Sequence, residues 1–383
     1  MRILFIARGV PDKNDPQWGS FELSQAKALK ALGHEVIIAS VDTRFRLYRR
    51  KLGLTTCTID GIKTYNLFLI PGSIVHLFGE HIYDCYNEWL WHQMETVILK
   101  ENEKIDIVYT HYLRNSHRAV HYLSNIHAPI VAIEHWSEVN QPTLLPCVKK
   151  MGDETYPKVA RLITVSNAAR QSILHHFGKD SDVVYNMVDP CFTYDAGNAT
   201  EHHDRFVFTA VGNLLPIKGY DMLIHAIGKV TIPRDKWTLQ IVGHGKERKH
   251  LEALISQYGL QQNIKLLGQK DKTEVQRLLS HSDAFVLASR SETFGVAYIE
   301  AMACGLPVIA TRCGGPEEFV TEKVGLLVPV DDADALAKAV DYMYEHHKEY
   351  DRQAIAEDCK ARFSQEVIAR QLTEIFEEVV NKR

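Results

Sequence analysis

The chain has 383 residues, a length that predicts about two domains rather than one core. Hydrophobic residues make up 45% and charged residues 24%, as in a typical globular protein, and the formal net charge of -4 gives no indication of nucleic acid as a partner. Seven scattered cysteines form no CxxC pair, so we expect a reduced, intracellular chain without a disulfide or zinc framework.

Short apolar, β-rich runs alternate with helical patterns along the whole chain. The strands expected in the first half cover 3–7, 35–40, 65–70, 106–111, 130–135, 161–166 and 182–186, and those in the second half cover 206–211, 238–243, 263–268, 284–289 and 307–311. Continuous apolar runs separated by helices indicate parallel strands covered on both faces. Two such series predict an α/β protein with two Rossmann-like, doubly wound sheets.

A polar, aperiodic segment at 195–205 predicts the linker between these sheets. The expected domains are therefore 1–195 and 205–362, and the amphipathic tail 363–383 is expected to form a helix that packs back toward the first domain. Ligands of open α/β sheets bind beyond the carboxyl ends of the strands, so we expect a site in a cleft between the two domains.

The most informative segment is 291–305, which follows an apolar strand. A helix is expected to begin near Gly295, where free backbone N–H groups would favour an anion and the glycine would allow it to approach. Glu300 lies about a turn and a half into that helix, where it would accept hydrogen bonds from vicinal hydroxyls such as those of a ribose. Glu292 precedes the helix and would face another part of the same ligand. The alternative interpretation is that both glutamates are solvated surface acids.

Two further loops place glycine or lysine beside a helix start. Lys218 follows the strand at 206–211 and suits a phosphate, although an isolated surface lysine is the simpler interpretation. Gly19 lies in the loop after the first strand, in the sequence 17–21. The pair Gly243 and Gly245 is a weaker candidate, because the third glycine of a dinucleotide fingerprint is absent.

Together these segments resemble the retaining glycosyltransferases of family 4. The sequence "ETFGVAYIE" at 292–300 is similar to the family's E-x-F-G-x-x-x-x-E motif, and it continues into "AMACGLPVIA" at 301–310. The segments 211–226, 241–255 and 314–337 extend the resemblance, as do shorter matches at 33–36, 165–170 and 185–189. The resemblance implies a GT-B fold, in which two Rossmann-like domains face each other across an interdomain cleft, with the acceptor side in the first domain and the nucleotide-sugar in the second.

The resemblance also implies roles for individual residues. Glu300 would bind the ribose, Glu292 would contact the donor sugar, and Lys218 would stabilise the leaving diphosphate. His135 matches a histidine near the donor sugar, although a packed histidine at a strand end is equally plausible from the residue alone. The catalytic set is His135, Lys218 and Glu292, and the donor or nucleotide set is Gly19, Asn213, Lys218, Lys270, Glu292, Phe294, Gly295, Val296 and Glu300.

The chain departs from the family pattern at two places. Asn213 stands where the family often has an arginine that clamps phosphate, and Arg290 or Lys246 is considered as its replacement. Trp18 stands in a loop where two glycines are common. No cluster of metal ligands is apparent, so we expect no metal requirement and no cofactor beyond the nucleotide-sugar substrate.

Two segments of the first half suggest the acceptor. Residues 43–52 interleave basic and apolar side chains, which suits either an anionic membrane surface or an ordinary solvated face. Residues 83–99 are rich in aromatics and predict either a helix that lines an acceptor groove or an ordinary core helix. No run approaches the roughly 18 apolar residues of a membrane span, and the apolar run at the N-terminus is too short for a signal peptide. We therefore expect a cytoplasmic protein, with peripheral membrane contact as an option.

The expected activity is transfer of a sugar, in a hexosyltransferase-type reaction, to a saccharide or lipid-linked acceptor in cell-surface polysaccharide or glycoconjugate biosynthesis. UDP is favoured as the nucleotide because UDP donors are frequent in the family. Two alternatives stay open on the same fold. One is a nucleotide-sugar 2-epimerase, and the other is a non-catalytic nucleotide-binding protein.

Overall fold

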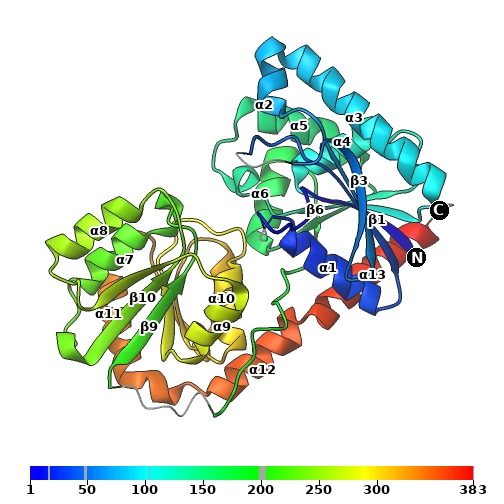
Figure 1. Ribbon diagram of the computed structural model, residues 1–383. Helices are drawn as coiled ribbons and strands as arrows, with labels where there is room; N and C mark the ends of the chain where they lie inside the picture. Colours follow the sequence, from blue (N-terminus) through cyan, green and yellow to red (C-terminus); the bar gives the residue numbers. More distant parts are fainter. Residues whose placement is uncertain (16–17, 47–49, 103, 198–203, 383) are drawn as a thin grey trace. The chain divides into compact units, whose positions relative to one another are not determined.

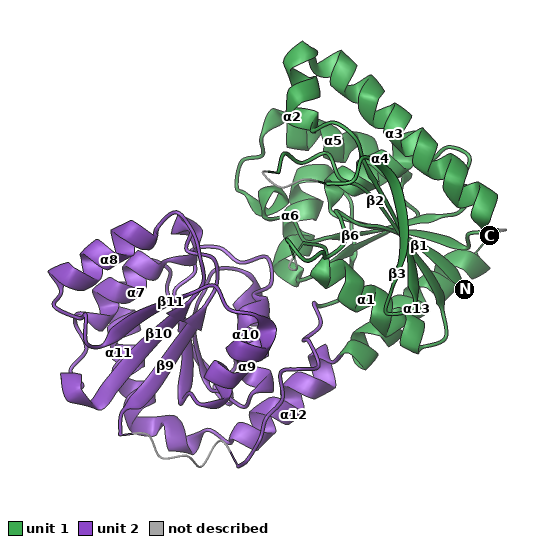
Figure 2. Ribbon diagram, in the orientation of Figure 1, with its two compact units in different colours: residues 1–185, 365–383 green, residues 186–364 purple. Residues whose placement is uncertain are grey.

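A computed structural model describes residues 1–15, 18–46, 50–102, 104–197 and 204–382. The chain forms two compact units. Unit 1 contains residues 1–185 and 365–383, and unit 2 contains residues 186–364 (Figure 2). The predicted linker at 195–205 lies partly outside the described residues and falls within unit 2 rather than at its boundary. No helix among the described residues combines the length and apolar character needed to cross a membrane.

Unit 1 is built on one sheet whose strands are parallel except for the edge strand β3. Its order is β3-β4-β2-β1-β5-β6-β7-β8 (Figure 1). The bounds are β1 Arg2–Ile6, β2 Glu35–Val41, β3 Gly53–Ile59, β4 Ile62–Phe68, β5 Ile107–His111, β6 Ile130–Glu134, β7 Arg161–Thr164 and β8 Asp182–Val183. Because β1 and β5 are neighbours, the strand order reverses between them. This is the topological switch point of the unit, where α/β proteins place ligands.

The helices of unit 1 are α1 Ser20–Ala31, α2 Gly72–Val75, α3 Glu80–Glu101, α4 Leu113–Tyr122, α5 Pro146–Thr155, α6 Asn167–Phe177 and α13 Gln365–Asn381. A buried cluster that includes Leu4, Tyr65, Trp91 and Met94 joins the sheet to α3. The C-terminal helix α13 packs against α1, and Phe376 contacts the ring of Tyr109 on β5. The last helix of the chain therefore belongs to the core of unit 1.

Unit 2 contains a parallel sheet in the order β11-β10-β9-β12-β13-β14 (Figure 1). Its strands are β9 Phe206–Val211, β10 Trp237–Val242, β11 Ile264–Gly268, β12 Ala284–Leu287, β13 Val308–Thr311 and β14 Gly325–Val328. Its helices are α7 Tyr220–Ile227, α8 Arg248–Gln257, α9 Lys272–Ser280, α10 Val296–Ala303, α11 Ala333–His346 and α12 Arg352–Phe363. Here the order reverses between β9 and β12, which gives this unit its own switch point.

The prediction of two doubly wound sheets is confirmed, and most predicted strands lie within two residues of the observed ones. The strand predicted at 65–70 is shifted, since β4 covers Ile62–Phe68, and β8 has only two residues. The strands β3 and β14 were not predicted. The polar pattern of β3 reflects its position at the sheet edge, where it pairs antiparallel with β4 alone and exposes part of its length.

Candidate functional site

Most of the donor residues proposed from the sequence lie at or near the switch point of unit 2. The loop 212–219 follows β9, and the loop 288–295 follows β12, and these two strands are direct neighbours in the sheet. Both loops therefore leave the same edge of the sheet side by side. Lys218 lies in the first loop, and Glu292 and Gly295 lie in the second.

A short hydrogen-bonded chain joins the two loops. Lys218 Nζ donates to Glu292 Oε1 over 2.6 Å, and Ser289 Oγ donates to the same oxygen over 2.7 Å. The Glu292 side chain is 9% exposed and that of Lys218 is 25% exposed. A lysine and a carboxylate at this distance in a mostly buried position form a strong charge-assisted pair. Sequence reasoning proposed both charged residues but missed Ser289, for which no motif gave a signal.

The backbone around Glu292 is fixed on both sides. Its N–H donates to Cys313 O over 3.1 Å, and Gly315 N–H donates to its carbonyl over 3.0 Å. The next apolar side chain, Phe294, is buried and packs against the rings of Phe319 and Phe363. The loop is thus anchored by its apolar side chain, while its backbone and the Glu292 carboxylate stay at the sheet edge. Such anchoring holds a binding group in place before a ligand arrives.

Glycines allow the two loops to approach each other. Gly219 has φ +61, and a Cβ there would lie 1.9 Å from the carbonyl oxygen of Ala288. Gly295 has φ +101 and is the N-cap of α10, so Val296 is the first residue of that helix. The start of α10 directs its N–H groups and positive dipole end toward the loop that carries Glu292. Gly243 and Gly245 also pack tightly, against the backbone of the loop 212–214, which gives that pair a structural role.

Glu300 lies on α10, beside an ion pair that Lys272 Nζ forms with Asp189 Oδ2 over 2.5 Å. Its surroundings raise the pKa of Glu300 to about 7. Burial is the main cause, the Lys272 charge opposes it, and the Asp189 charge adds to it. Among the described residues, no side chain or backbone group donates a hydrogen bond to the Glu300 carboxylate. The carboxylate is therefore available to accept hydrogen bonds from a ligand.

The remaining donor candidates in unit 2 are less constrained. Asn213 is exposed, and Lys270 is half-buried in the loop after β11. Arg290, considered as a replacement for the missing phosphate clamp, donates to Asp221 through two nitrogens over 2.9 and 2.8 Å and to Asp331 over 2.8 Å. Because two carboxylates already compensate its charge, Arg290 is a poor substitute. Lys246 is exposed, so it is the better candidate for replacing the phosphate clamp.

Gly19 and His135 belong to unit 1. Gly19 is the N-cap of α1 with φ +76, and a Cβ there would meet Gly9 O at 2.1 Å. The His135 ring stacks on His111 with centroids 5.3 Å apart and contacts the edge of Phe21 at 5.0 Å. His135 follows Glu134, a buried residue at the end of β6 whose burial raises its pKa to about 7 although it accepts bonds from Trp136 N and Tyr156 Oη.

A cavity of about 310 Å³ opens at the switch point of unit 1. It lies at the carboxyl ends of β1, β2, β5 and β6, and its lining residues are Arg8, Trp18, Val41, Asp42, Thr43, Arg44, Tyr112, Arg114, Asn115, Arg118 and Trp136. Arg8 and Arg44 both lie over the Trp18 ring, at 4.9 and 3.5 Å from its centroid. Sequence reasoning singled out Trp18 only as a departure from the family pattern and Arg44 only as part of the basic segment 43–52. It missed Arg8, Arg114 and Arg118, which are far from that segment in sequence.

One residue of this cavity has an unusual backbone. Tyr112 has φ +70, which is strained for a side chain other than glycine, and it is the N-cap of α4. Its N–H donates to Ile133 O, and Arg8 lies 4.1 Å from its ring centroid. Strained residues of this kind collect at ligand sites.

The segments proposed for the acceptor are partly described. In 43–52, residues 47–49 lie outside the described residues, Arg44 and Arg46 pair with Asp15, and Phe45 is exposed. The predicted helix at 83–99 is part of α3. Its side chains Leu90, Trp91, Met94 and Ile98 belong to the core, so the core-helix interpretation holds for that face.

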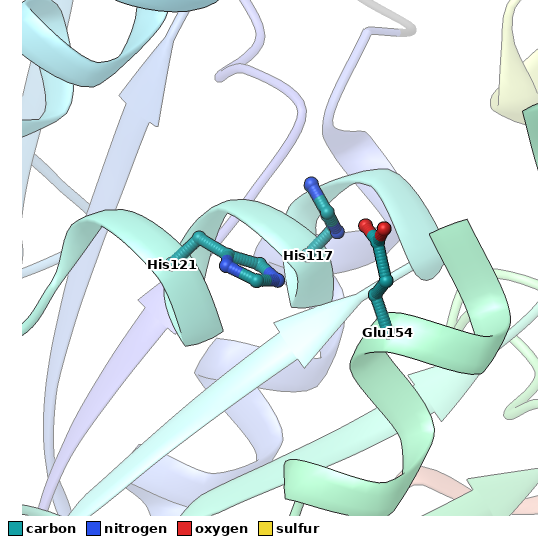
Figure 3. Close-up of side chains that lie close together, drawn as sticks. All are labelled: His117, His121 and Glu154. Carbon is teal, nitrogen blue, oxygen red and sulfur yellow. The ribbon is translucent and has the colours of Figure 1, made fainter. Parts of the chain in front are cut away.

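The prediction of no metal-ligand cluster overlooked a pair of histidines at i and i+4. His117 and His121 on α4 converge with Glu154 on α5, and their ligand atoms lie within 4.8 Å of one another (Figure 3). The spacing was visible in the sequence, but Glu154 is brought in only by the packing of α4 against α5. The adjacent pair His202 and His203 lies outside the described residues.

Comparison with known proteins gives two family matches. Residues 196–358 match the family described as glycosyl transferases group 1, and residues 23–191 match glycosyltransferase family 4. The phosphatidylinositol N-acetylglucosaminyltransferase GPI3 subunit of Saccharomyces cerevisiae is 23% identical over 325 residues, which cover 81% of this chain and 68% of that protein. The N-acetyl-alpha-D-glucosaminyl L-malate synthase of Bacillus anthracis is 25% identical over 372 residues, which cover 92% of each chain.

A solved structure shares the whole fold. Anabaena HepE in complex with UDP superposes with a TM-score of 0.76 at 19% identity, over 99% of this chain and 100% of that chain. The two family matches together span most of the chain, one in each half, and the relatives' names favour a transferase over the 2-epimerase and the non-catalytic alternatives. The chain therefore belongs to the group 1, family 4 glycosyltransferases and has their GT-B fold.

Proposed function

We propose that this glycosyltransferase moves a sugar from a UDP-sugar to a saccharide or lipid-linked acceptor, with retention of anomeric configuration, in the biosynthesis of a cell-surface polysaccharide or glycoconjugate. The proposal assigns the donor to unit 2 and the acceptor to unit 1. Support for UDP comes from HepE, which was solved with UDP, and support for a glycoconjugate comes from the GPI3 relative, which is named for transfer to phosphatidylinositol. We place the reaction in the cytoplasm, at or near a membrane surface.

The observation that carries the donor assignment is the pair of Lys218 and Glu292 at the switch point of unit 2. Each group satisfies the other in the ligand-free protein. When a donor diphosphate arrives, Lys218 exchanges Glu292 for phosphate oxygens, and the released carboxylate can accept hydrogen bonds from the sugar hydroxyls. This exchange keeps both groups hydrogen-bonded, which a largely buried charged group requires.

In the proposed reaction, the bond between the anomeric carbon and the diphosphate oxygen breaks while negative charge grows on that oxygen. Lys218 and the N-terminus of α10 stabilise this charge. The acceptor hydroxyl attacks the same face of the sugar and gives its proton to the departing phosphate oxygen. No protein nucleophile is required, because the acceptor hydroxyl attacks the anomeric carbon directly. His135 would contribute from unit 1 by contacting the donor sugar.

The proposed leaving-group stabilisation uses protein cations, so we expect transfer to persist in EDTA. Proton NMR of the first-formed product, with each UDP-sugar offered to a saccharide or lipid-linked acceptor, gives both the donor and the anomeric configuration. A product with the donor's configuration supports the proposal. A product with inverted configuration, or loss of transfer in EDTA that added magnesium restores, would refute the mechanism.

Donor affinity should depend on pH through Glu300. Its pKa of about 7 in the free protein means that it is mostly protonated at pH 6, whereas two ribose hydroxyls bind best to the ionised carboxylate. Below pH 7 binding must therefore expel a proton, so the affinity for UDP-glucose should rise about tenfold between pH 6 and pH 8. UDP-glucose is a suitable probe because its diphosphate diester does not titrate in this range.

The matched control is Glu300→Gln, which cannot ionise. Isothermal titration should give it a nearly flat affinity between pH 6 and pH 8, at the weaker level of the wild type at pH 6. An unchanged pH dependence in Glu300→Gln would show that another group titrates and would remove Glu300 from the ribose site.

A further inference from the structure

We propose that the cavity of unit 1 binds the phosphate-bearing head group of a lipid acceptor, and that exposed apolar side chains beside it contact the membrane that contains this lipid. The inference rests on the proposed function, because it names the acceptor class of the same reaction. Three features of unit 1 carry it: the charge of the cavity, its size, and the surface next to it.

The cavity has an excess of positive charge. Two of its arginines are compensated, since Arg8 Nε donates to Glu22 Oε1 over 2.7 Å and Arg44 Nη2 donates to Asp42 Oδ2 over 2.7 Å. The other two, Arg114 and Arg118, form no ion pair with a carboxylate among the described residues. Arg118 donates to Asn115 Oδ1 over 3.3 Å and shares a hydrogen bond with the Tyr83 side chain, and Arg114 lies over the Trp136 ring at 5.0 Å from its centroid.

An arginine in such a position needs an anion. Burial is the main cause of the lowered pKa of Arg118; Tyr83 opposes this effect, and the neighbouring charge of Arg114 adds to it. A half-buried cation beside a second cation is stabilised when a ligand supplies negative charge. The planar fork of arginine binds phosphate through two parallel hydrogen bonds, and a guanidinium that stacks on an aromatic ring, as that of Arg114 does, keeps its N–H edge free for such a ligand.

The size of the cavity limits what it can hold. A volume of about 310 Å³ is at the lower end of small-molecule sites, enough for a phosphate with one attached ring but not for acyl chains as well. A lipid acceptor would therefore place its head group in the cavity and its chains outside.

Exposed apolar residues lie directly beside the cavity. The segment that contains α2 and the start of α3 exposes Ile74, Leu77, Phe78 and Ile82, which are 42%, 82%, 69% and 50% exposed, and we call these four residues the apolar tip. The segment is tied to the cavity wall, because Gly72 N–H donates to the carbonyl of Thr43 over 2.6 Å. Figure 1 shows α2 leading up to the beginning of α3 at one end of unit 1.

Apolar side chains beside a basic pocket are the combination that binds an anionic membrane surface. The two relatives have names that include phosphatidylinositol and malate, both of them anions, which agrees with an anionic acceptor in either a lipid or a soluble form. The apolar tip favours the lipid form of the acceptor. Use of a soluble anionic acceptor instead of a lipid would contradict this choice.

The first experiment measures sedimentation of the full chain with vesicles of phosphatidylcholine alone and with added phosphatidylinositol. We expect binding only to the anionic vesicles. The double variant Leu77→Ser/Phe78→Ser should reduce the partition coefficient at least about tenfold, because two large side chains no longer leave water. Both residues are exposed, so the fold should not change. Leu145→Ser, which alters a leucine of unit 1 that is 61% exposed, is the control and should bind as the wild type does.

The second experiment tests the cavity with Arg118→Met. We expect a rise of about 10- to 100-fold in the KM for the phospholipid acceptor. The melting temperature should stay nearly the same, because Arg118 is half-buried and has no carboxylate partner among the described residues to leave unpaired. Arg170→Gln, at a surface arginine of unit 1 paired with Asp180, should change neither quantity.

The outcomes separate this inference from the donor assignment. Loss of vesicle binding in Leu77→Ser/Phe78→Ser, with an unchanged affinity for UDP-glucose, supports the inference. Failure to bind UDP-glucose would count against the donor site in unit 2 but would leave vesicle binding as an independent result. Tight binding of malate or inorganic phosphate without any binding to anionic vesicles would overturn the lipid assignment, and an unchanged acceptor KM in Arg118→Met would overturn the role of the cavity.

A second and independent observation concerns the cluster of His117, His121 and Glu154. We propose that it binds one zinc ion that ties α4 to α5 in unit 1, separate from the sugar-transfer chemistry. Two imidazoles and a carboxylate are a common zinc ligand set. The Nε2 atom of His121 is buried and has no hydrogen-bond partner among the described residues, and His117 Nδ1 lies 3.0 Å from Thr155 Oγ1, which orients its ring.

Titration with zinc against a chromophoric chelator should show one site that raises the melting temperature and is lost in His121→Ala. His175→Ala, at an exposed histidine of α6, should retain it. Equal affinity in the wild type and His121→Ala would refute the site.

Discussion

Lys218→Ala should lower the turnover number for sugar transfer by about 10²- to 10³-fold while it changes the KM for the donor only a few-fold. The reason is that the negative charge on the leaving diphosphate oxygen grows between the ground state and the transition state, so the lysine contributes more as the bond breaks. The measurement is steady-state kinetics with the UDP-sugar that the wild type uses.

The control for this prediction is Lys249→Ala, which removes an exposed lysine of α8 in the same unit. It should leave turnover unchanged, so that a general loss of positive charge is excluded. Lys218→Ala also leaves Glu292 with only the Ser289 hydroxyl, so its melting temperature is measured in parallel. If folded Lys218→Ala turns over like the wild type, Lys218 has no part in the reaction.

Gly219→Ala should be nearly as damaging, through geometry rather than charge. Its φ of +61 is unfavourable for alanine, and the new methyl group would lie 1.9 Å from Ala288 O, a backbone atom that cannot rotate away. The loop with Lys218 must then move away from the loop with Glu292. We expect a fall in turnover of about 10²-fold, since a displacement of this size misplaces the cation, and a loss of about 2–4 kcal/mol in the free energy of unfolding.

Gly259→Ala provides a matched control, because Gly259 has nearly the same φ, +63, and lies in the same unit. The nearest atom to a Cβ there is the flexible end of Arg234 at 3.5 Å. This variant carries the backbone strain without the collision, so we expect a loss of about 1 kcal/mol and normal turnover. If the two variants behaved alike in turnover, the close approach of the two loops would be irrelevant to the chemistry.

The sequence was sufficient to predict the two sheets because each buried parallel strand leaves a continuous apolar run, as in 206–211 and β9. It failed for β3, which exposes Thr56, Cys57 and Thr58, and for β14, which has only four residues. Edge and very short strands lack the periodicity on which such predictions depend.

The donor residues were accessible to sequence reasoning because Glu292, Gly295 and Glu300 are close together in one loop and helix. The residues that these donor residues contact could not be predicted from the sequence. The contact between Lys218 and Glu292 joins residues 74 positions apart, and the raised pKa of Glu300 arises from burial beside Lys272 and Asp189. The residues of the unit 1 cavity are still further apart in the sequence, since its arginines come from the loops after β1 and β2 and from α4. Only the sheet order brings them to one edge.

The measurement that tests the central claim most directly is isothermal titration of the full chain with UDP-glucose, GDP-mannose and ADP-glucose in EDTA, on the wild type, Lys218→Ala and Glu300→Gln. The proposed donor site in unit 2 predicts selective binding of the UDP-sugar without metal, weakened about 5- to 100-fold by Glu300→Gln. Binding of UDP-glucose with the same affinity in all three proteins, or of none of the three nucleotide-sugars to the wild type, would contradict it.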